Sequence, residues 1–192
     1  MNTELHERLQ LSDILLNHVE LLSLLQHIRA HAPWAYLSAG VIRNTLWSYL
    51  HAEIYALHGS EIDVIFFDAT DQQDDRAQQL QQVLAKELPH YQWDVVNQAL
   101  VHHWYRLPNG KPIPPYTSLS DAIACWPETA TAIAVRLDAT DQLEIIAPCG
   151  LQDLLQLKLR WNSRMVPRGV FLARVESKGF LQRWPKLQYI EE

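Results

Sequence analysis

The sequence has few of the features that mark secreted or membrane-spanning chains. Its two cysteines, Cys125 and Cys149, form neither a CxxC pair nor a metal-ligand spacing, so we expect reduced thiols and no disulfide framework. No run approaches 18 consecutive apolar residues, and the first ten residues lack the apolar core of a signal peptide. We therefore expect a cytoplasmic protein with no membrane partner.

Low-complexity segments are also missing. Charged residues make up 20% of the chain, and there are only 6 Gly and 10 Pro, which argues against disordered linkers and repeat arrays. With 48% hydrophobic residues, 192 positions are enough to bury a core. We predict one domain over 1–192, with an N-terminal helical region (1–32), a core (33–150) and a basic C-terminal segment (151–192).

Positive charge is scarce until the last quarter of the chain. Residues 1–150 carry 8 basic against 18 acidic side chains, whereas residues 151–190 carry 8 basic against 2 acidic ones. This asymmetry suggests an acidic face for cations beside a basic segment for phosphates, although a solvated surface without a specific partner is the alternative. The basic residues of this segment are Lys158, Arg160, Arg164, Arg168, Arg174, Lys178, Arg183 and Lys186.

Hydrophobic periodicity predicts a mixed α and β chain. Apolar positions at three- and four-residue spacing predict helices over 3–31, 41–54, 71–88 and 150–161. Short apolar or β-branched runs predict strands over 34–40, 62–68, 93–100, 131–137 and 142–148. The segment 34–54 therefore has the order strand, glycine turn, helix.

Two acidic residues open the second predicted strand. Side chains two apart on a strand share a face, so the carboxylates of Glu61 and Asp63 converge while Ile62 and Val64 enter the core. Converging carboxylates repel one another unless a cation lies between them. Mg²⁺ prefers such oxygen ligands, with substrate phosphates completing its coordination. The pair therefore predicts a magnesium site, although a solvated strand end has the same pattern.

A phosphate-binding turn is predicted upstream of the acids. Ser38 and Gly40 lie in a turn that enters a helix containing Arg43 and Asn44. Backbone N–H groups at a helix start attract phosphate, and arginine adds a forked positive donor. Asp94 lies on the next predicted strand and is positioned to supply a third carboxylate. A phosphate site facing clustered acids fits two-metal phosphoryl chemistry.

The motifs AGVIRNTLW and EIDVIFFD resemble the signature of the DNA polymerase beta-like nucleotidyltransferases, in the version of the tRNA CCA-adding enzymes. The blocks WDVVNQALVHHW, WPETATAIAVRLD, APCGLQDLL and RWPKL resemble a bacterial nucleotidyltransferase-like family of that superfamily, over roughly residues 30–187. The resemblance implies an α+β nucleotidyltransferase fold, a small mixed β-sheet flanked by helices.

By the same resemblance, Gly40 and Arg43 would meet the triphosphate of an NTP. Glu61 and Asp63 would be paired ligands of Mg²⁺ or Mn²⁺, and Asp94 would be the third acid. The implied reaction moves a nucleoside monophosphate from the NTP to an acceptor hydroxyl and releases pyrophosphate. A small molecule, a protein and an RNA end are all candidate acceptors.

Several alternatives remain open at this stage. The superfamily pattern has Asp where this chain has Glu61, so an inactive nucleotide-binding or regulatory module of the same fold is the second hypothesis. Glu128 competes with Asp94 as the third acid. Asp68 follows an apolar strand as in haloacid dehalogenase-type phosphatases, but the second Asp of that motif is Thr70.

Polar residues near the third predicted strand have two readings each. Asn97 and Gln98 would either contact a nucleotide or tie down a neighbouring loop. His102 and His103 are adjacent, so at most one of them would face a cleft if they lie on a strand.

Overall fold

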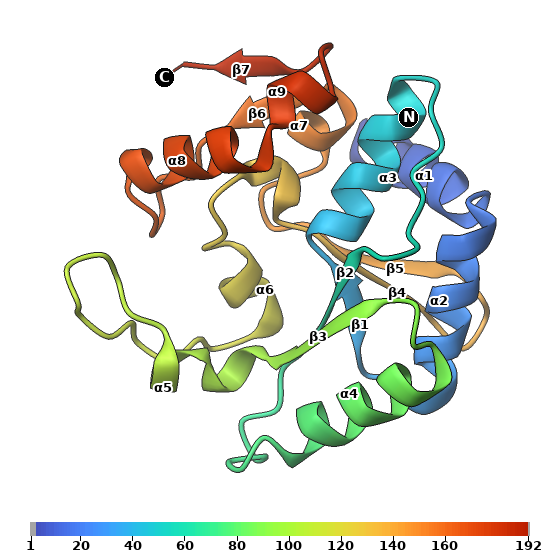
Figure 1. Ribbon diagram of the computed structural model, residues 1–192, viewed down its shortest axis with the longest axis vertical. Coiled ribbons are helices and arrows are strands. Elements are labelled where there is room, and N and C mark those ends of the chain that lie inside the picture. The colour runs from blue at the N-terminus through green and yellow to red at the C-terminus, as the bar shows by residue number, and fades with distance from the viewer. Residues whose placement is uncertain (1–2, 192) are drawn as a thin grey trace.

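The computed structural model describes residues 3–191 and is built around a five-stranded mixed sheet (Figure 1). The strands lie in the order β3-β2-β1-β4-β5, of which only β2 and β3 are parallel. Their bounds are β1 Tyr36–Ser38, β2 Glu61–Phe66, β3 Gln92–Asn97, β4 Ala134–Leu137 and β5 Leu143–Ile146. The predicted mixed sheet flanked by helices is confirmed.

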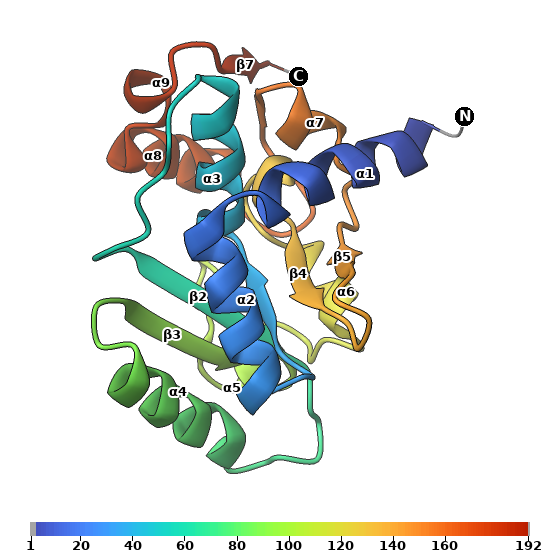
Figure 2. The same ribbon diagram turned by 90° about the vertical axis from the view of Figure 1, so that its right-hand side faces the viewer.

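Helices cover both faces of this sheet. The bounds of the helices before β3 are α1 Thr3–Leu16, α2 Val19–His31, α3 Gly40–Leu50 and α4 Asp75–Glu87. Figure 2 shows α2 lying across the sheet, with α4 beside β3. The opposite face carries a smaller apolar cluster in which Tyr36 and Ile65 pack with Ile123. Ile123 belongs to the short helix α6 (Leu119–Ile123), which follows α5 (Val101–Trp104).

The C-terminal part of the chain packs beside α3 (Figure 2). Its elements are α7 Gln152–Leu155, β6 Lys158–Arg160, α8 Arg168–Lys178, α9 Phe180–Arg183 and β7 Gln188–Ile190. Trp47 of α3 meets Phe180 and Trp184 edge-on, at ring-centroid distances of 6.0 and 5.4 Å. One apolar cluster therefore runs from Leu11 to Leu187. We propose on this basis that the described residues, 3–191, fold as one unit, in line with the single domain expected over 1–192.

The predicted helix over 3–31 is two helices. The Nδ1 atom of His18 accepts a hydrogen bond from the backbone N–H of Leu21 at 3.2 Å and so caps the start of α2. The His18 Nε2 atom lies 2.9 Å from the backbone oxygen of Tyr55. Tyr55 lies 37 positions after His18 in the sequence, so the apolar periodicity of 3–31 could not show that the helix breaks before α2.

The predicted helix over 150–161 is also wrong beyond its first turn. Leu157 has φ 56°, a left-handed conformation that ends the helix. The following strand β6 pairs in parallel with β7, about thirty residues later in the chain. The strand predicted over 93–100 ends at Asn97, which caps a single 3-10 turn over Gln98–Leu100. No helix within residues 3–191 is long and apolar enough to cross a membrane.

Candidate functional site

The three predicted acids lie at one edge of the sheet. Because β2 and β3 are parallel and in register, Asp63 is paired with Asp94 across the two strands. Glu61 is exposed, Asp63 is half-buried, and Ile62 between them is fully buried, as the strand alternation predicts. Glu61 and Asp63 therefore share the sheet face that lies opposite α2.

Burial and neighbouring charge perturb these carboxyl groups. The pKa of Asp63 rises to about 6, chiefly through burial and then through the charges of Glu61 and Asp94. The backbone N–H of Gly40 and the charge of Arg43 oppose this rise. The pKa of Asp94 is also raised, first by burial and then by Glu61. The three carboxylates therefore repel one another, and a bound cation would relieve that repulsion.

The turn between β1 and α3 brings backbone amides to the same place. Gly40 is the first residue of α3, and its backbone N–H favours the ionised form of Asp63 and so opposes the rise in the Asp63 pKa. A Cβ at Gly40 would lie 3.7 Å from Asp63 Oδ2, so the glycine leaves space beside the acid. The residue with left-handed backbone is Ala39, at φ 51° and ψ −118°. The buried Ser38 hydroxyl donates to the backbone oxygen of Asp63 at 3.4 Å.

A polar pocket of about 310 Å³ opens beside this turn and contains most of the predicted phosphate-binding residues. Arg43 lies in its wall but is only 4% exposed. Its Nη1 donates to Thr131 Oγ1 at 2.9 Å, and its Nη2 donates to Asn44 Oδ1 at 2.8 Å. The guanidinium also lies 4.5 Å from the ring centroid of Phe180. Arg43 is thus held rigidly at the back of the pocket.

Burial, more than any neighbouring charge, lowers the pKa of Arg43 to about 10. Asn44 continues the network by donating to the Tyr55 hydroxyl at 3.0 Å, which lies 3.1 Å from Ser60 Oγ. Tyr55 and Ser60 line the pocket and were missed from the sequence. They lie in a loop without a recognisable motif, and only contacts between distant residues bring them to α3.

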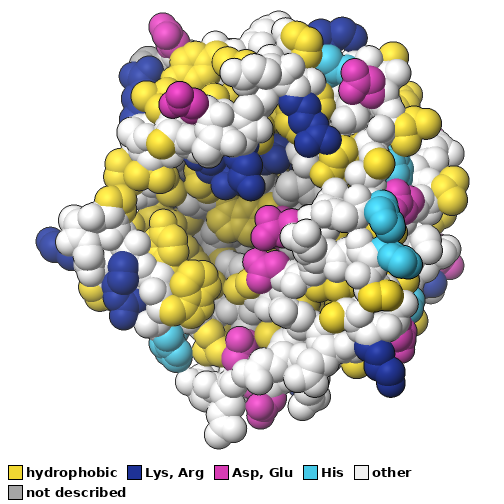
Figure 3. All heavy atoms as spheres, viewed as in Figure 1, with side chains coloured by type: hydrophobic (Ala, Val, Ile, Leu, Met, Phe, Trp, Pro, Cys, Tyr) yellow, Lys and Arg dark blue, Asp and Glu magenta, His cyan; other side chains and the backbone are white. Residues whose placement is uncertain are grey.

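The basic C-terminal segment supplies the opposite wall. Arg174, Lys178 and Arg183 line the polar pocket. Figure 3 shows basic side chains along the upper rim of a hollow, with acidic side chains across from them. Other basic residues of the segment have structural partners: Arg164 pairs with Asp121 at 2.6 Å, and Lys186 Nζ donates to the backbone oxygen of Leu50 at 3.0 Å. Basic side chains of the C-terminal segment and acidic side chains of the core therefore face each other across one cleft.

A second pocket, of about 300 Å³, adjoins the first and is mostly apolar. Ala39, Asp63 and Arg174 line both pockets, so Asp63 lies where they meet. The rings that line the second pocket are Trp104, Tyr105, Tyr116 and Trp126. Aromatic rings of this kind stack flat apolar groups, including nucleobases.

Glu128 occupies a different environment from the three edge acids. Its side chain is fully buried, and its Oε1 accepts from Arg174 Nε at 2.6 Å. Asp94 lies on β3 beside Asp63 and lines the second pocket. Glu128 therefore anchors an arginine, whereas Asp94 faces the cleft.

The donor set at the edge fits a hard divalent cation, because it consists of three carboxylates whose like charges raise the pKa values of Asp63 and Asp94. The carboxylate oxygens of Glu61, Asp63 and Asp94 do not form a close group of three donor atoms. Within residues 3–191, only His27, His31 and Glu87 have three donor atoms that all lie within 4.8 Å of one another. Binding of an ion by Glu61, Asp63 and Asp94 together would therefore require their side chains to draw closer.

The remaining predicted residues have structural roles or lie elsewhere. Asn97 accepts from Asp68 N at 3.0 Å and donates to Asp68 O at 2.8 Å, so it ties down the loop after β2. Gln98 lines the second pocket. Asp68 pairs with Arg76 at 3.0 Å, beyond the far end of β2 from Glu61. His102 and His103 lie on the helix α5 and not on a strand.

Comparison with known proteins places this geometry in context. A family model described as nucleotidyltransferase matches residues 28–189. A solved structure described as a CCA-adding enzyme head domain is 27% identical, with a TM-score of 0.76 and 95% of each chain covered.

Two longer chains, both described as CCA-adding enzymes, share the fold at lower identity. The Thermotoga maritima enzyme complexed with tRNA is 16% identical over 94% of this chain and 42% of its own, with a TM-score of 0.54. A CCA-adding enzyme in complex with CTP is 16% identical over 94% of this chain and 43% of its own, with a TM-score of 0.56. The chain thus spans less than half the length of these enzymes. No protein of curated function matches it.

Proposed function

Because the chain belongs to a nucleotidyltransferase family, we propose that it transfers a nucleoside monophosphate from an NTP to an acceptor hydroxyl and releases pyrophosphate. The observation that carries this proposal is the acid cluster at the sheet edge. Asp63 is paired in register with Asp94, has a raised pKa, and lies beside Gly40, the first residue of α3. That site lies where a polar basic pocket joins an apolar aromatic one.

The polar pocket suits the triphosphate. Arg174, Lys178 and Arg183 converge on it from the C-terminal segment, and Arg43 lies behind them. A triphosphate is an anion with several charges, and arginine binds its oxygens through forked donors. Catalysis by these side chains would be positioning together with electrostatic stabilisation of the departing pyrophosphate.

The carboxylates Glu61, Asp63 and Asp94 would hold Mg²⁺ or Mn²⁺. When bound, such ions lower the pKa of the attacking hydroxyl and stabilise the leaving group. Raised pKa values at Asp63 and Asp94 support this role, since the metal-free cluster is left with uncompensated repulsion.

The apolar pocket suits a flat ring. Trp104 is 63% exposed although it is a large aromatic residue, and it borders this pocket together with Trp126. We propose that the pocket receives either the base of the NTP or the end of the acceptor. Small-molecule, protein and RNA-end acceptors are all compatible with this arrangement.

The test is pyrophosphate release from each of the four NTPs with Mg²⁺ or Mn²⁺, using RNA ends and small hydroxyl compounds as acceptors. We expect D63N to abolish release and to keep the fold, as judged by circular dichroism. D75N, at the exposed start of α4, is the matched control and should retain release. Undiminished release by D63N would overturn the role of Asp63.

A second function is favoured by two observations. The three acid ligands are not drawn within 4.8 Å of one another, and Glu61 is one methylene longer than the Asp of the superfamily pattern. We propose as the alternative a nucleotide-binding or regulatory module that lacks turnover. Calorimetry with ATP and Mg²⁺ would then show binding by the wild type, while pyrophosphate release stays at background with every NTP.

A further inference from the structure

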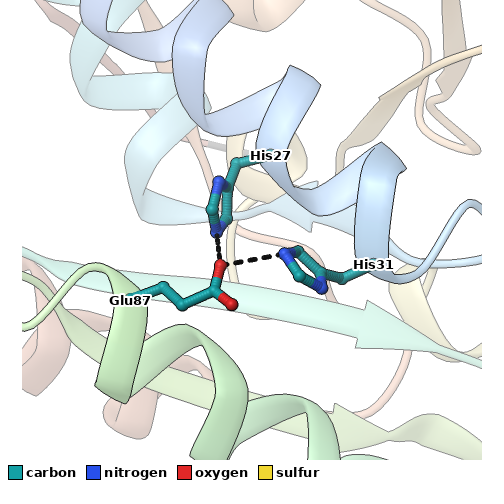
Figure 4. Close-up of side chains that lie close together, drawn as sticks. All are labelled: His27, His31 and Glu87. Atoms are coloured by element: carbon teal, nitrogen blue, oxygen red, sulfur yellow. Dashed lines mark ion pairs between the residues drawn. The ribbon is translucent and has the colours of Figure 1, made fainter.

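A cluster of possible metal ligands lies away from the cleft, between α2 and α4. His27 and His31 are four residues apart on α2, so their imidazoles share one side of that helix. Glu87 is the last residue of α4. Both Nε2 atoms lie 2.9 Å from the same oxygen, Glu87 Oε2, and the two rings are 4.8 Å apart (Figure 4).

The geometry of one contact is not that of a hydrogen bond. The Nε2 atom of His27 is buried and has no hydrogen-bond partner, although Glu87 Oε2 is only 2.9 Å away. The approach is therefore off the axis along which this nitrogen donates or accepts. A buried polar atom without a partner calls for a ligand, because leaving it unpaired is unfavourable.

We propose that His27, His31 and Glu87 form a binding site for a divalent transition-metal ion, with Zn²⁺ as the preferred occupant. Two imidazoles and one carboxylate are a donor set that zinc accepts, with solvent completing a tetrahedral site. Imidazole ligands select zinc, copper or nickel over Mg²⁺, which favours oxygen ligands. This site is thus chemically distinct from the acid cluster at Glu61 and Asp63.

The present separations are close to those of a zinc site. Bonds of about 2.0–2.1 Å in a tetrahedron put neighbouring ligand atoms about 3.3 Å apart. The two Nε2 to Oε2 distances are 2.9 Å, so each must open by a few tenths of an ångström. The Glu87 side chain is 41% exposed and is free to make this adjustment. Both histidine side chains are also partly open to solvent, which gives an ion a path of entry.

An ion held there would join two helices that are separate in the chain. The helix α2 lies over the sheet and α4 packs against β3 (Figure 2). Since the ligands come from both helices, the metal binds the folded state more tightly than the unfolded chain. Occupancy should therefore raise thermal stability by mass action.

The test is a calorimetric titration of the metal-free protein with Zn²⁺ in excess Mg²⁺, so that the oxygen-ligand cluster is already filled. We expect one equivalent of Zn²⁺ and a higher thermal midpoint. The H27A/H31A double variant should lose at least about 100-fold in Zn²⁺ affinity. E87Q should bind more weakly than the wild type, and Co²⁺ should give the visible absorption of a tetrahedral site in the wild type but not in H27A/H31A.

The matched control is H58A/H90A, since these rings form a second histidine pair with centroids 5.1 Å apart. This control and D63N should bind Zn²⁺ as the wild type does. Alanine favours helix, so H27A/H31A should keep the helical signal in circular dichroism. Absence of Zn²⁺ binding by the wild type, or equal affinity in H27A/H31A, would overturn the site.

Discussion

Arg174 donates from Nε to the carboxylate of Glu128 at 2.6 Å, and that carboxylate is fully buried. The same arginine lines both pockets of the cleft. Glu128 therefore fixes the position of a positive charge at the place where the polar pocket meets the apolar one. This geometry gives Glu128 a positioning role that its place before β4 did not suggest.

Variants of the Glu128 and Arg174 pair distinguish an effect on stability from an effect on ligand binding. We expect R174A to lower the free energy of unfolding by about 3 kcal/mol, because it leaves a buried carboxylate unpaired. The double variant E128Q/R174M removes the charge as well and should regain most of that loss in denaturant melts. NTP affinity, measured by calorimetry, should stay weak in both. Wild-type affinity in the stable double variant would exclude Arg174 from phosphate binding.

The raised pKa of Asp63 makes the stability of the metal-free protein depend on pH. Its folded pKa of about 6 exceeds the ordinary aspartate value of 3.8, so the native state binds more protons than the unfolded state between these values. Stability should therefore fall as the pH rises from about 4 to 6 and stay lower above that range. Chelator-treated protein, melted in urea at a series of pH values, provides the measurement.

D63N is the companion variant for that experiment. At pH 8 without metal we expect it to be more stable than the wild type by about 2 kcal/mol, because it removes a desolvated charge. Below pH 4 the two should coincide. Addition of Mg²⁺ should stabilise only the wild type. An unchanged difference across this pH range would mean that Asp63 does not carry the perturbed charge.

The length of Glu61 is open to a direct test. E61D restores the Asp of the superfamily pattern and shortens the side chain by one C–C bond, about 1.5 Å. Because Mg²⁺ demands near-ideal octahedral geometry, we expect E61D to bind Mg²⁺ about tenfold more tightly than the wild type. E61Q, which keeps the length and loses the charge, should bind it more weakly. Weaker Mg²⁺ binding by E61D in calorimetry would show that the longer side chain is needed.

Ala39 carries the backbone strain of the turn. Its φ of 51° with ψ of −118° is a conformation that glycine adopts freely and alanine does not. We expect A39G to raise the free energy of unfolding by about 1 kcal/mol, as measured by denaturant melts. A39V should lower it, because β-branched residues are genuine outliers at positive φ. A destabilised A39G would imply that the methyl group of Ala39 contributes packing beyond this strain.

Local patterns predicted the elements around the acids well. Ile62 and Val64 alternate with Glu61 and Asp63, and this period fixed both the strand and the face on which the carboxylates lie. The position of Asp94 relative to Asp63 required the parallel pairing of two strands, which a strand, helix, strand order favours. The sequence was therefore enough to predict that Glu61, Asp63 and Asp94 lie together on two neighbouring strands.

Contacts between distant residues account for what was missed. The turn was expected to depend on Gly40, but the positive φ belongs to Ala39, because the helix begins one residue earlier than its apolar pattern. The sequence suggests that Arg43 is a free phosphate ligand, yet Thr131 and Asn44 accept hydrogen bonds from three of its five N–H groups. The residue spacing around Arg43 predicts neither contact. Thr131 lies 88 positions away, and Asn44 is the next residue along the helix, where side chains are not expected to face each other.

The aromatic packing of Trp47, Phe180 and Trp184 bears on how a substrate reaches the cleft. These rings are at most 1% exposed, and they fasten the basic wall to the helix that starts at Gly40. Movement of that wall away from α3 would expose three large rings to water, at a free-energy cost on the order of 10 kcal/mol. A hinge at this seam is therefore strongly disfavoured, and any ligand of the cleft would enter and leave through its open side without movement of the basic wall.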